Sequence, residues 1–444
     1  MKLFSIIAFS ALFGALHVKA DNAYKTLTLK DLISRTLLYN GDIGRIGRSK
    51  AAALLDVRQS YANFLPSLSA WSTHSNAEFG TKNLTYQEQL SSGASISLTL
   101  FDGFNSFRNV QRARYSWMAA ESDEIVKKQE IVFSVASKYI QLYLDSEIVS
   151  VEEKNVGEQR SLLAKIESFK KAGQKPIGDW LTQKAIVASE ESRLAGVRHD
   201  FELAKLQLVE ITGDSSLSAE FTLKRPDFDS IKVAFYLQTD SLLSKIFDQR
   251  KDILGRRYAI KASECALALA QNASWPTLAA SAQAQSGYSS PDPTGVSIRN
   301  QFKDKNVNSS IGLSLSVPIF DRDSVRFAVS RAKLQLEQNR ADLQELKLKA
   351  LSEIRQALLI YQTALDQTRA TTIELESARQ ALSAAQIRYD AGAMTLTELT
   401  VANTLYMTGL NDNTLTVYQV IEAIAGVGFA AGLIDTIIGC LRED

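Results

Sequence analysis

The sequence of 444 residues contains few of the residue types on which catalytic and disulfide-stabilised proteins depend. Its two cysteines, Cys265 and Cys440, are too few for a disulfide framework, and they are either a single pair or two separate thiols. The three histidines lie far apart, and no metal-ligand spacing, glycine-rich phosphate loop or G-x-S-x-G nucleophile turn occurs. The sequence therefore predicts a protein that is not an enzyme and holds no cofactor or metal.

Neither sign of charge is in excess, with 50 basic and 49 acidic residues. Nucleic-acid-binding domains usually carry a basic excess or patch, so we expect no nucleic-acid partner. A long apolar run is also missing. The best candidate for a spanning helix, 423–434, is short and lies between Glu422 and Asp435. We therefore expect either a soluble protein or one that enters a membrane by strands.

The first twenty residues have the composition of a secretory signal. Lys2 gives a positive start, 3–16 is almost wholly apolar, and 18–20 (VKA) offers a small-x-small cleavage site before Asp21. The alternative is an N-terminal membrane anchor, which the short apolar stretch and the absence of a stop-transfer pattern disfavour. Residues 1–20 are predicted to be a signal peptide.

Proline is scarce, and its seven positions leave two long tracts, 106–175 and 323–444, without any. A proline in a helix interior costs about 3 kcal/mol or more, so both tracts are free to be helical. Apolar residues recur along them at alternating steps of three and four, which is the pattern of a coiled-coil stripe. A helix over 106–172 would be about 100 Å long. We predict two long helices of this kind.

Each long helix is predicted to end at a glycine, Gly173 in the first and Gly392 in the second, because glycine easily makes a turn with positive φ. Helical patterning then resumes over 177–211 and 396–424. We therefore expect two α-helical hairpins, each made of a long helix, a tight turn and a returning helix.

The two hairpins belong to halves of the chain that resemble each other. A shift of 219 residues, the separation of Phe101 and Phe320, aligns the halves without a gap over 101–173. Two unrelated amphipathic helices would not be expected to share an apolar register over roughly seventy residues, so we predict an internal repeat. The predicted parts are a first repeat (21–213), a linking equatorial region (214–240) and a second repeat (241–444).

Each half also carries two predicted strands before its long helix. The clearer strand of each pair alternates apolar with mostly small polar residues, in 94–100 (ASISLTL) and in 311–319 (IGLSLSVPI). Such alternation most often covers a globular core, but strands of about ten residues with one apolar face also fit a membrane barrel. The strands are expected near 65–74, 93–101, 275–285 and 309–320, with polar loops over about 75–92 and 286–308.

Four strands are too few to close a membrane barrel, since known barrels begin at about eight. Left open, their edges would lie unpaired in lipid, which is energetically forbidden. If the strands enter a membrane, several copies of the chain must share one barrel, and three copies would supply twelve strands. The long helices of three copies would then form a second, helical tube, and the polar strand faces would line a water-filled lumen.

This plan resembles the TolC family of outer-membrane efflux and type I secretion channels across essentially the whole mature chain. The segment 314–321 (SLSVPIFD) is similar to the family's strand-to-helix segment, and 388–392 (RYDAG) followed by 395–399 (TLTEL) is similar to its second hairpin tip. The resemblance implies a mainly α fold with a membrane β-barrel. Long coiled-coil hairpins would form an α-barrel, and a homotrimer would share a twelve-stranded β-barrel.

The resemblance also implies a function. The protein would be a passive exit duct in the outer membrane of a Gram-negative bacterium, with a long periplasmic extension, for tripartite efflux or type I secretion. Its partners would be a periplasmic adaptor, an inner-membrane transporter and outer-membrane lipid. The alternative is a periplasmic adaptor or a structural coiled-coil protein that does not enter the membrane, although two hairpins and two strand pairs fit an adaptor poorly.

Three residues would form part of the closed inner end of such a duct. By their place in the family's motifs, Tyr389 and Asp179 match residues that link neighbouring hairpins, and Glu398 matches an acidic ring in the pore. A threefold ring of carboxylates would attract cations to a narrow mouth. On the residues alone, Asp179 and Glu398 are equally explained as carboxylates on a solvated helix face or at a helix start.

The hairpin turns and two departures from the family's pattern complete the expected site. Gly173 and Gly392 would be the turns that face the adaptor. Val401 stands where a second acidic residue is expected, and Met394 stands where a bonding arginine is expected. We therefore expect a weaker charge filter and a closed end that is held by fewer polar links.

Overall fold

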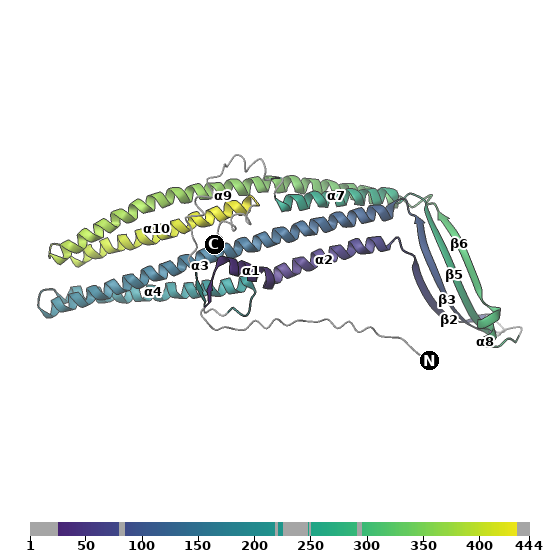
Figure 1. The fold of residues 1–444 in the computed structure, drawn as a ribbon, viewed down its shortest axis with the longest axis horizontal. Helices are drawn as coiled ribbons and strands as arrows, with labels where there is room; N and C mark the ends of the chain where they lie inside the picture. The colour runs from purple at the N-terminus through teal and green to yellow at the C-terminus, as the bar shows by residue number, and fades with distance from the viewer. Residues whose placement is uncertain are drawn as a thin grey trace.

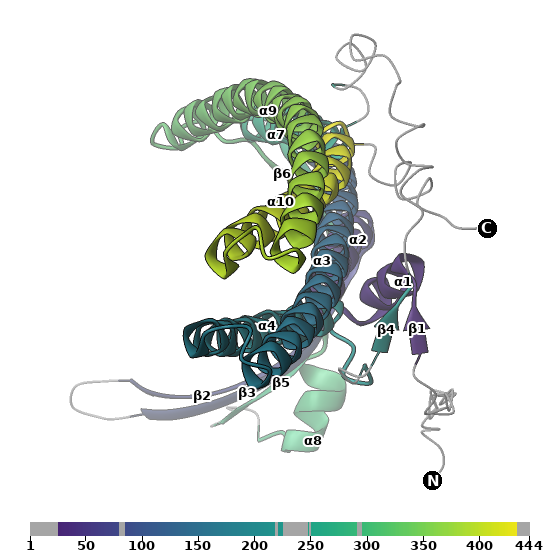
Figure 2. The same ribbon diagram turned by 90° about the vertical axis from the view of Figure 1, so that its left-hand side faces the viewer.

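A computed structural model describes residues 25–79, 85–217, 221–224, 247, 250–290 and 295–432. Figure 1 shows an elongated molecule with two helical hairpins at one end and a four-stranded sheet at the other. In the view along its long axis, the helices follow an open arc (Figure 2). The predicted signal peptide, Cys440 and most of the predicted linking region 214–240 lie outside the described residues.

Two pairs of long helices form the hairpins. Helix α3 (Asn105–Lys171) turns into α4 (Ile177–Thr212), and α9 (Ser324–Asp390) turns into α10 (Leu396–Ala430). Helices α3 and α9 are each 67 residues long, and their first residues are separated by the same 219 positions as the halves of the sequence. Within each pair the helices pack along each other. No described helix combines the length and apolar composition that crossing a membrane as a helix requires.

Shorter helices widen the sheet-proximal half of the molecule. Helix α2 (Gly41–Ala62) packs on α3, and α7 (Lys251–Asn272) packs on both α3 and α9. Each is followed within five residues by a strand of the sheet. The free thiol of Cys265 is buried on α7, and burial raises its pKa.

A small accessory unit lies on the convex side of the helical arc (Figure 2). Strand β1 (Lys25–Leu27) pairs in parallel with β4 (Phe221–Leu223), beside helix α1 (Leu29–Tyr39). Its apolar residues join a core with α3 and α4. The buried members of this core are Leu27, Leu29, Leu32, Val135, Ala136, Tyr139, Leu142, Leu208 and Phe221.

The large sheet contains β2 (Ser67–Phe79), β3 (Thr85–Phe101), β5 (Thr277–Ser290) and β6 (Asn308–Ser316). Their order is β2-β3-β5-β6, and every neighbouring pair is antiparallel. In the described part of the chain, the outer edges of β2 and β6 pair with no further strand. The sheet is therefore open on both sides.

The strands of the first pair reach farther than the sequence pattern predicts. Apolar alternation fades after His74, yet β2 continues to Phe79 and β3 already begins at Thr85, so much of the predicted loop 75–92 is strand. Backbone hydrogen bonds between β2 and β3 hold this polar stretch in strand conformation. Cross-strand side-chain contacts, such as that of Ser72 Oγ with Ser92 Oγ at 2.8 Å, add to this pairing.

The second strand pair differs from the prediction at both ends. Strand β5 runs on to Ser290, and β6 ends at Ser316 rather than near 320, because Pro318 has no N–H to donate to a ladder. Strand β5 extends past its pairing with β6, and there its edge contacts the π-helix η1 (Gln301–Lys305), which directly follows the short helix α8 (Ile298–Asn300). The buried Gln301 side chain accepts a hydrogen bond from Ser289 N at 3.0 Å and donates to Ser289 O at 3.3 Å.

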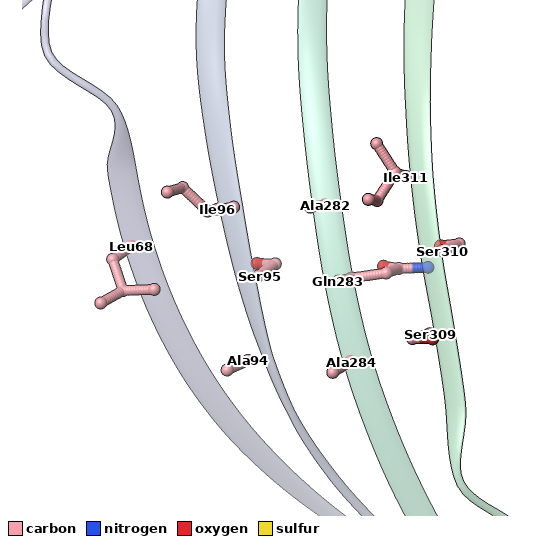
Figure 3. Close-up of a pocket in the computed structure, with 10 residues that line it drawn as sticks. All are labelled: Leu68, Ala94, Ser95, Ile96, Ala282, Gln283, Ala284, Ser309, Ser310 and Ile311. Carbon is pink, nitrogen blue, oxygen red and sulfur yellow. The ribbon is translucent and has the colours of Figure 1, made fainter.

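The two faces of the sheet differ in chemistry. One row across the four strands is apolar, and Figure 3 shows its members Leu68, Ile96, Ala282 and Ile311. The next row points to the other face and is polar. Its members are Ser69, Ser95, Gln283 and Ser310. Ile311 is 90% exposed and Leu68 is 78% exposed, so no described residue of the chain covers this part of the apolar face.

Candidate functional site at the hairpin tips

Both hairpins turn through the same backbone motif. At the first tip, Gly173 adopts φ +72°, its N–H donates to Lys170 O, and the N–H of Gln174 donates to Phe169 O. These two bonds define a Schellman motif, whose positive φ favours glycine. A Cβ at Gly173 would meet no other atom within 4 Å, so the turn is open to a partner. The second tip repeats the motif, with Gly392 at φ +73° and hydrogen bonds from Gly392 N to Tyr389 O and from Ala393 N to Arg388 O.

Tyr389 joins the two hairpins beside these turns. Its side chain is 2% exposed and belongs to a tip cluster of buried residues contributed by α3, α9 and α10. The ammonium of Lys175, from the first turn, lies 4.4 Å from the centre of the Tyr389 ring. The tip cluster consists of Ile166, Ala385, Tyr389, Leu396 and Leu399.

Asp179 lies near Tyr389 without bonding to it. Burial raises the pKa of Tyr389, and the carboxylates of Asp179 and Asp390 raise it further. The Tyr389 hydroxyl has no hydrogen-bond partner among the described residues. An ion pair between Lys165 of α3 and Asp390 of α9 instead supplies the ionic link between the hairpins. Within one chain, packing, a cation–π contact and this ion pair connect the two hairpin tips.

Glu398 begins helix α10 as half of a capping box. Its carboxylate accepts hydrogen bonds from Thr395 N and Thr395 Oγ1, both at 2.8 Å, and its own N–H donates to Thr395 Oγ1 at 3.3 Å. The bond from the Thr395 backbone, then that from its hydroxyl, lowers the pKa of Glu398. The side chain is exposed and ionised near neutral pH. The T-x-x-E pattern signals this cap in the sequence, and the cap leaves the charge at the tip surface.

The two departures from the family pattern have different surroundings. Met394 packs against the tip cluster, so an apolar contact stands where a bonding arginine was expected. Val401 is 65% exposed on α10 and contributes no charge. Within the described ranges, no group of three or more His, Cys, Asp or Glu side chains is arranged to hold a metal ion.

Lysines at the first tip were not singled out by the sequence reasoning. The ammonium of Lys170 lies 3.8 Å from the centre of the Trp180 ring, and that of Lys184 lies 5.2 Å from it. The run Lys170-Lys171, with Lys175 soon after, was the available signal. Its contacts with aromatic rings depend on how α3 and α4 fold back on each other.

Replacing Tyr389 tests whether packing or the hydroxyl holds the tips together. We expect Tyr389→Ala to lower the free energy of unfolding by about 3 kcal/mol, because it removes a buried ring. Tyr389→Phe should change it by less than about 0.5 kcal/mol, because the lost hydroxyl has no partner. Urea unfolding followed by far-ultraviolet circular dichroism measures both. Equal damage by the two variants would show that the hydroxyl is bonded in the working protein.

Comparison with known proteins places this architecture in one family. The sequence profile of the outer membrane efflux protein family matches residues 32–214 and 242–432. The pyoverdine export outer membrane protein OpmQ of Pseudomonas aeruginosa is 24% identical over 400 residues, which cover 86% of this chain and 81% of OpmQ. The cation efflux system protein CusC of Escherichia coli K12 is 22% identical over 386 residues, covering 85% of this chain and 79% of CusC.

Solved structures agree with this assignment at the level of the fold. A crystal structure of CusC superposes with a TM-score of 0.79 at 18% identity, and the match covers 91% of each chain. The outer membrane protein VceC of Vibrio cholerae superposes with a TM-score of 0.74, covering 91% of this chain and 96% of VceC at 18% identity. The family match spans more than half of the chain and includes both hairpins. The chain belongs to the outer membrane efflux protein family, the TolC-like channels, whose place is the outer membrane of Gram-negative bacteria.

Proposed function

We propose that three copies of this chain form one exit duct for tripartite efflux or type I secretion. The duct is a passive channel that is opened by a periplasmic adaptor and an inner-membrane transporter. The observation that carries the proposal is a sheet with one apolar and one polar face, which is open at both edges and lies at the far end of the long helices.

The sheet edges support a shared barrel. The outer strands β2 and β6 run in opposite directions, so β6 of one copy can pair antiparallel with β2 of the next. Three sheets of four strands then close a barrel of twelve strands. In this barrel no strand edge is left unpaired, whereas an unpaired edge in lipid would be energetically very unfavourable. The apolar row with Ile311 would face lipid, and the row with Ser310 would face water.

The helices support a tube of three copies in the same way. The arc in Figure 2 is open, and apolar side chains remain exposed along α9 at separations close to whole numbers of helical turns. A neighbouring copy that covers this stripe would bury it. The residues of this stripe are Phe327, Leu334, Leu348, Leu359, Ile373 and Ile387, while Ile360 is also exposed on α9 but lies off the stripe.

Aromatic residues support a membrane boundary where the sheet meets the helices. Phe101, Phe104 and Trp275 contact one another there, with ring centres 5.4 to 6.4 Å apart. Phe104 and Trp275 are about half exposed. Membrane barrels carry such aromatic girdles at the two interfaces, so we assign this cluster to the periplasmic interface.

We further propose that the chain arose by duplication. The shared 219-residue offset and equal length of α3 and α9 support a two-fold internal repeat. The first repeat would comprise 21–213 and the second 241–444. The region 214–240 would link them around the equator, and 1–20 would be the signal peptide.

The hairpin tips are the proposed closed end of the duct. Glu398 would contribute one carboxylate per copy to a pore ring, while Tyr389 and Asp179 would hold neighbouring hairpins in place. Gly173 and Gly392 would face the adaptor. One relative is named for pyoverdine export and another for cation efflux, although this chain resembles both over most of its length. We therefore assign the choice of cargo to the partner transporter and adaptor.

The conductance of purified protein in a planar bilayer tests this function. We expect steady trimeric pores whose preference for cations falls in Glu398→Gln, because glutamine keeps the capping box but removes the charge. Since the pKa of Glu398 is lowered, the wild-type preference should persist at all pH values above the usual range of a glutamate. Unchanged selectivity would remove Glu398 from the constriction. A folded protein that forms no pores and stays soluble without detergent would favour the periplasmic coiled-coil alternative.

A further inference from the structure

The two hairpin tips carry opposite charge. The window 165–184 around the first turn contains five lysines and two acidic residues, Glu167 and Asp179. The equivalent window of the second hairpin, 384–403, contains one basic residue, Arg388, and two acidic ones, Asp390 and Glu398. The difference lies at equivalent places in two hairpins with the same turn geometry.

Ion pairing does not cancel the positive charge of the first tip. Lys165 pairs with Asp390, and Lys171 pairs with Glu167. Among the described residues, Lys170, Lys175 and Lys184 have no carboxylate partner. All three ammonium groups instead lie over aromatic rings, two over Trp180 and one over Tyr389.

The aromatic contacts order the lysine side chains while the ammonium groups lose little of their hydration. A lysine over an indole keeps part of its hydration while losing some freedom of its flexible side chain. Groups that are already ordered lose less conformational entropy when a ligand binds. Lys170 and Lys184 flank a single ring, one from the last turn of α3 and one from the second turn of α4. They form a fixed pair of positive charges beside an open turn.

We propose that this surface, Lys170 and Lys184 on Trp180, binds a carboxylate-rich segment of the protein that docks on the hairpin tips. The proposal rests on the proposed duct and adds the chemistry of the partner and the hairpin that recognises it. The second tip, with Glu398 exposed and Arg388 as its single basic residue, does not attract an acidic segment. The difference in charge thus allows the partner to distinguish the two hairpins. It also sets the rotational position at which the partner docks on the trimer.

A heptaglutamate peptide added to trimers in a planar bilayer tests the surface. From the side of the tips, the peptide should interrupt the current, and from the opposite side it should not. The frequency of interruptions should fall on the order of ten-fold in Lys170→Gln/Lys184→Gln, because steering by the positive pair is lost. Raising the salt from about 0.1 M to 1 M should have a similar effect, because the Debye length shortens from about 10 to 3 Å.

Two further variants separate the surface from general charge. Lys347→Gln/Lys349→Gln removes the same charge about 60 Å away along α9 and should leave the interruptions unchanged. Trp180→Leu keeps an apolar side chain but removes the ring, and should reduce binding by about two- to five-fold. Circular dichroism and size-exclusion chromatography establish that each variant is a folded trimer.

The outcomes separate this inference from the proposed function. A folded protein that forms no pores overturns the duct itself. Pores that heptaglutamate does not interrupt, or that heptalysine interrupts instead, keep the duct and overturn the acidic partner. Stronger interruption by inorganic tripolyphosphate than by heptaglutamate would overturn the carboxylate and assign the lysines to phosphate-bearing ligands.

Discussion

Ile311→Lys is expected to abolish insertion of the protein into lipid vesicles. Ile311 lies in an interior row of the apolar sheet face and is 90% exposed in a single chain, so lipid is its proposed surrounding. A lysine near the middle of a bilayer on the lipid face of a strand costs about 2–4 kcal/mol. The proposed trimer carries this cost three times, which is comparable to the whole stability of many domains.

The adjacent residue provides a matched control. Ser310 is on the same strand but points to the polar face, so Ser310→Lys introduces the same side chain into the proposed lumen. This variant should insert, assemble and conduct. Its selectivity should shift toward anions, because the neighbouring rows on the polar face contain no charged residue that would offset the lysine. These rows are Ser67, Ser97, Ser281 and Gly312 on one side and Trp71, Gly93, Gln285 and Asn308 on the other.

Flotation with vesicles and light scattering of detergent-solubilised protein measure insertion and assembly for both variants. Normal insertion of Ile311→Lys would mean that this face does not contact lipid. Failure of Ser310→Lys alone would mean that the two faces have been assigned the wrong way round.

Arg193→Leu is expected to destabilise the protein by about 3 kcal/mol per chain. Arg193 Nη2 of α4 lies 2.6 Å from a carboxylate oxygen of Glu152 on α3, and that carboxyl side chain is only 2% exposed. Removing one partner of a buried ion pair leaves an uncompensated charge, which typically costs 3–5 kcal/mol. We take the lower end because the Arg193 side chain is 43% exposed and water screens part of the interaction.

A second arginine on the same helix serves as a control that separates the effect of burial on stability from the effect of losing a charge. Arg198 pairs with Glu153 at the same distance of 2.6 Å, but both side chains are about half exposed. Arg198→Leu should therefore cost less than about 1 kcal/mol. Glu152→Leu/Arg193→Leu should recover most of the stability lost by Arg193→Leu, since it removes the stranded charge. Urea unfolding of all the variants tests this. Equal effects of Arg193→Leu and Arg198→Leu would mean that Glu152 is reached by water in the assembled protein.

The long helices were predictable because their signals are local. Proline-free sequence, a continuous apolar seam and a terminal glycine predicted a helix over 106–172, and α3 spans Asn105–Lys171. The turn at Gly173 required only the preference of glycine for positive φ. Each of these signals acts within a few residues, so folding of the distant parts of the chain does not alter it.

Strand ends and tip contacts were harder to predict because they depend on distant pairing. Serine-rich and glutamine-rich stretches on either side of 80–84 have no apolar pattern, yet pairing with the opposite strand makes them part of β2 and β3. The contact of Lys175 with Tyr389 joins residues of two hairpins that are more than 200 positions apart. Strand β1 likewise finds its partner β4 across most of the first half of the chain.

The sequence indicated that the expected site residues lie at the hairpin tips, but it did not indicate which hydrogen bonds they make. Tyr389 and Asp179 are neighbours, but the hydroxyl of the tyrosine is left without a partner. Glu398 lies at the start of α10, which is one of the two positions that the residues alone suggested, and there it caps the helix with Thr395 while its carboxylate remains exposed. The roles of all three in a pore stay predictions that the bilayer experiment tests.

Because α3 is so long, a small tilt at one end of the helix produces a large displacement at the other end. With 67 residues in one unbroken helix, its arm from the sheet to the hairpin turn measures about 100 Å. A tilt of about two degrees at the sheet end would move the turn by about 3.5 Å over this arm. That displacement is nearly as large as the 4.4 Å between the Lys175 ammonium and the Tyr389 ring. Contacts at the tips are therefore sensitive to small tilts at the sheet end of the helix.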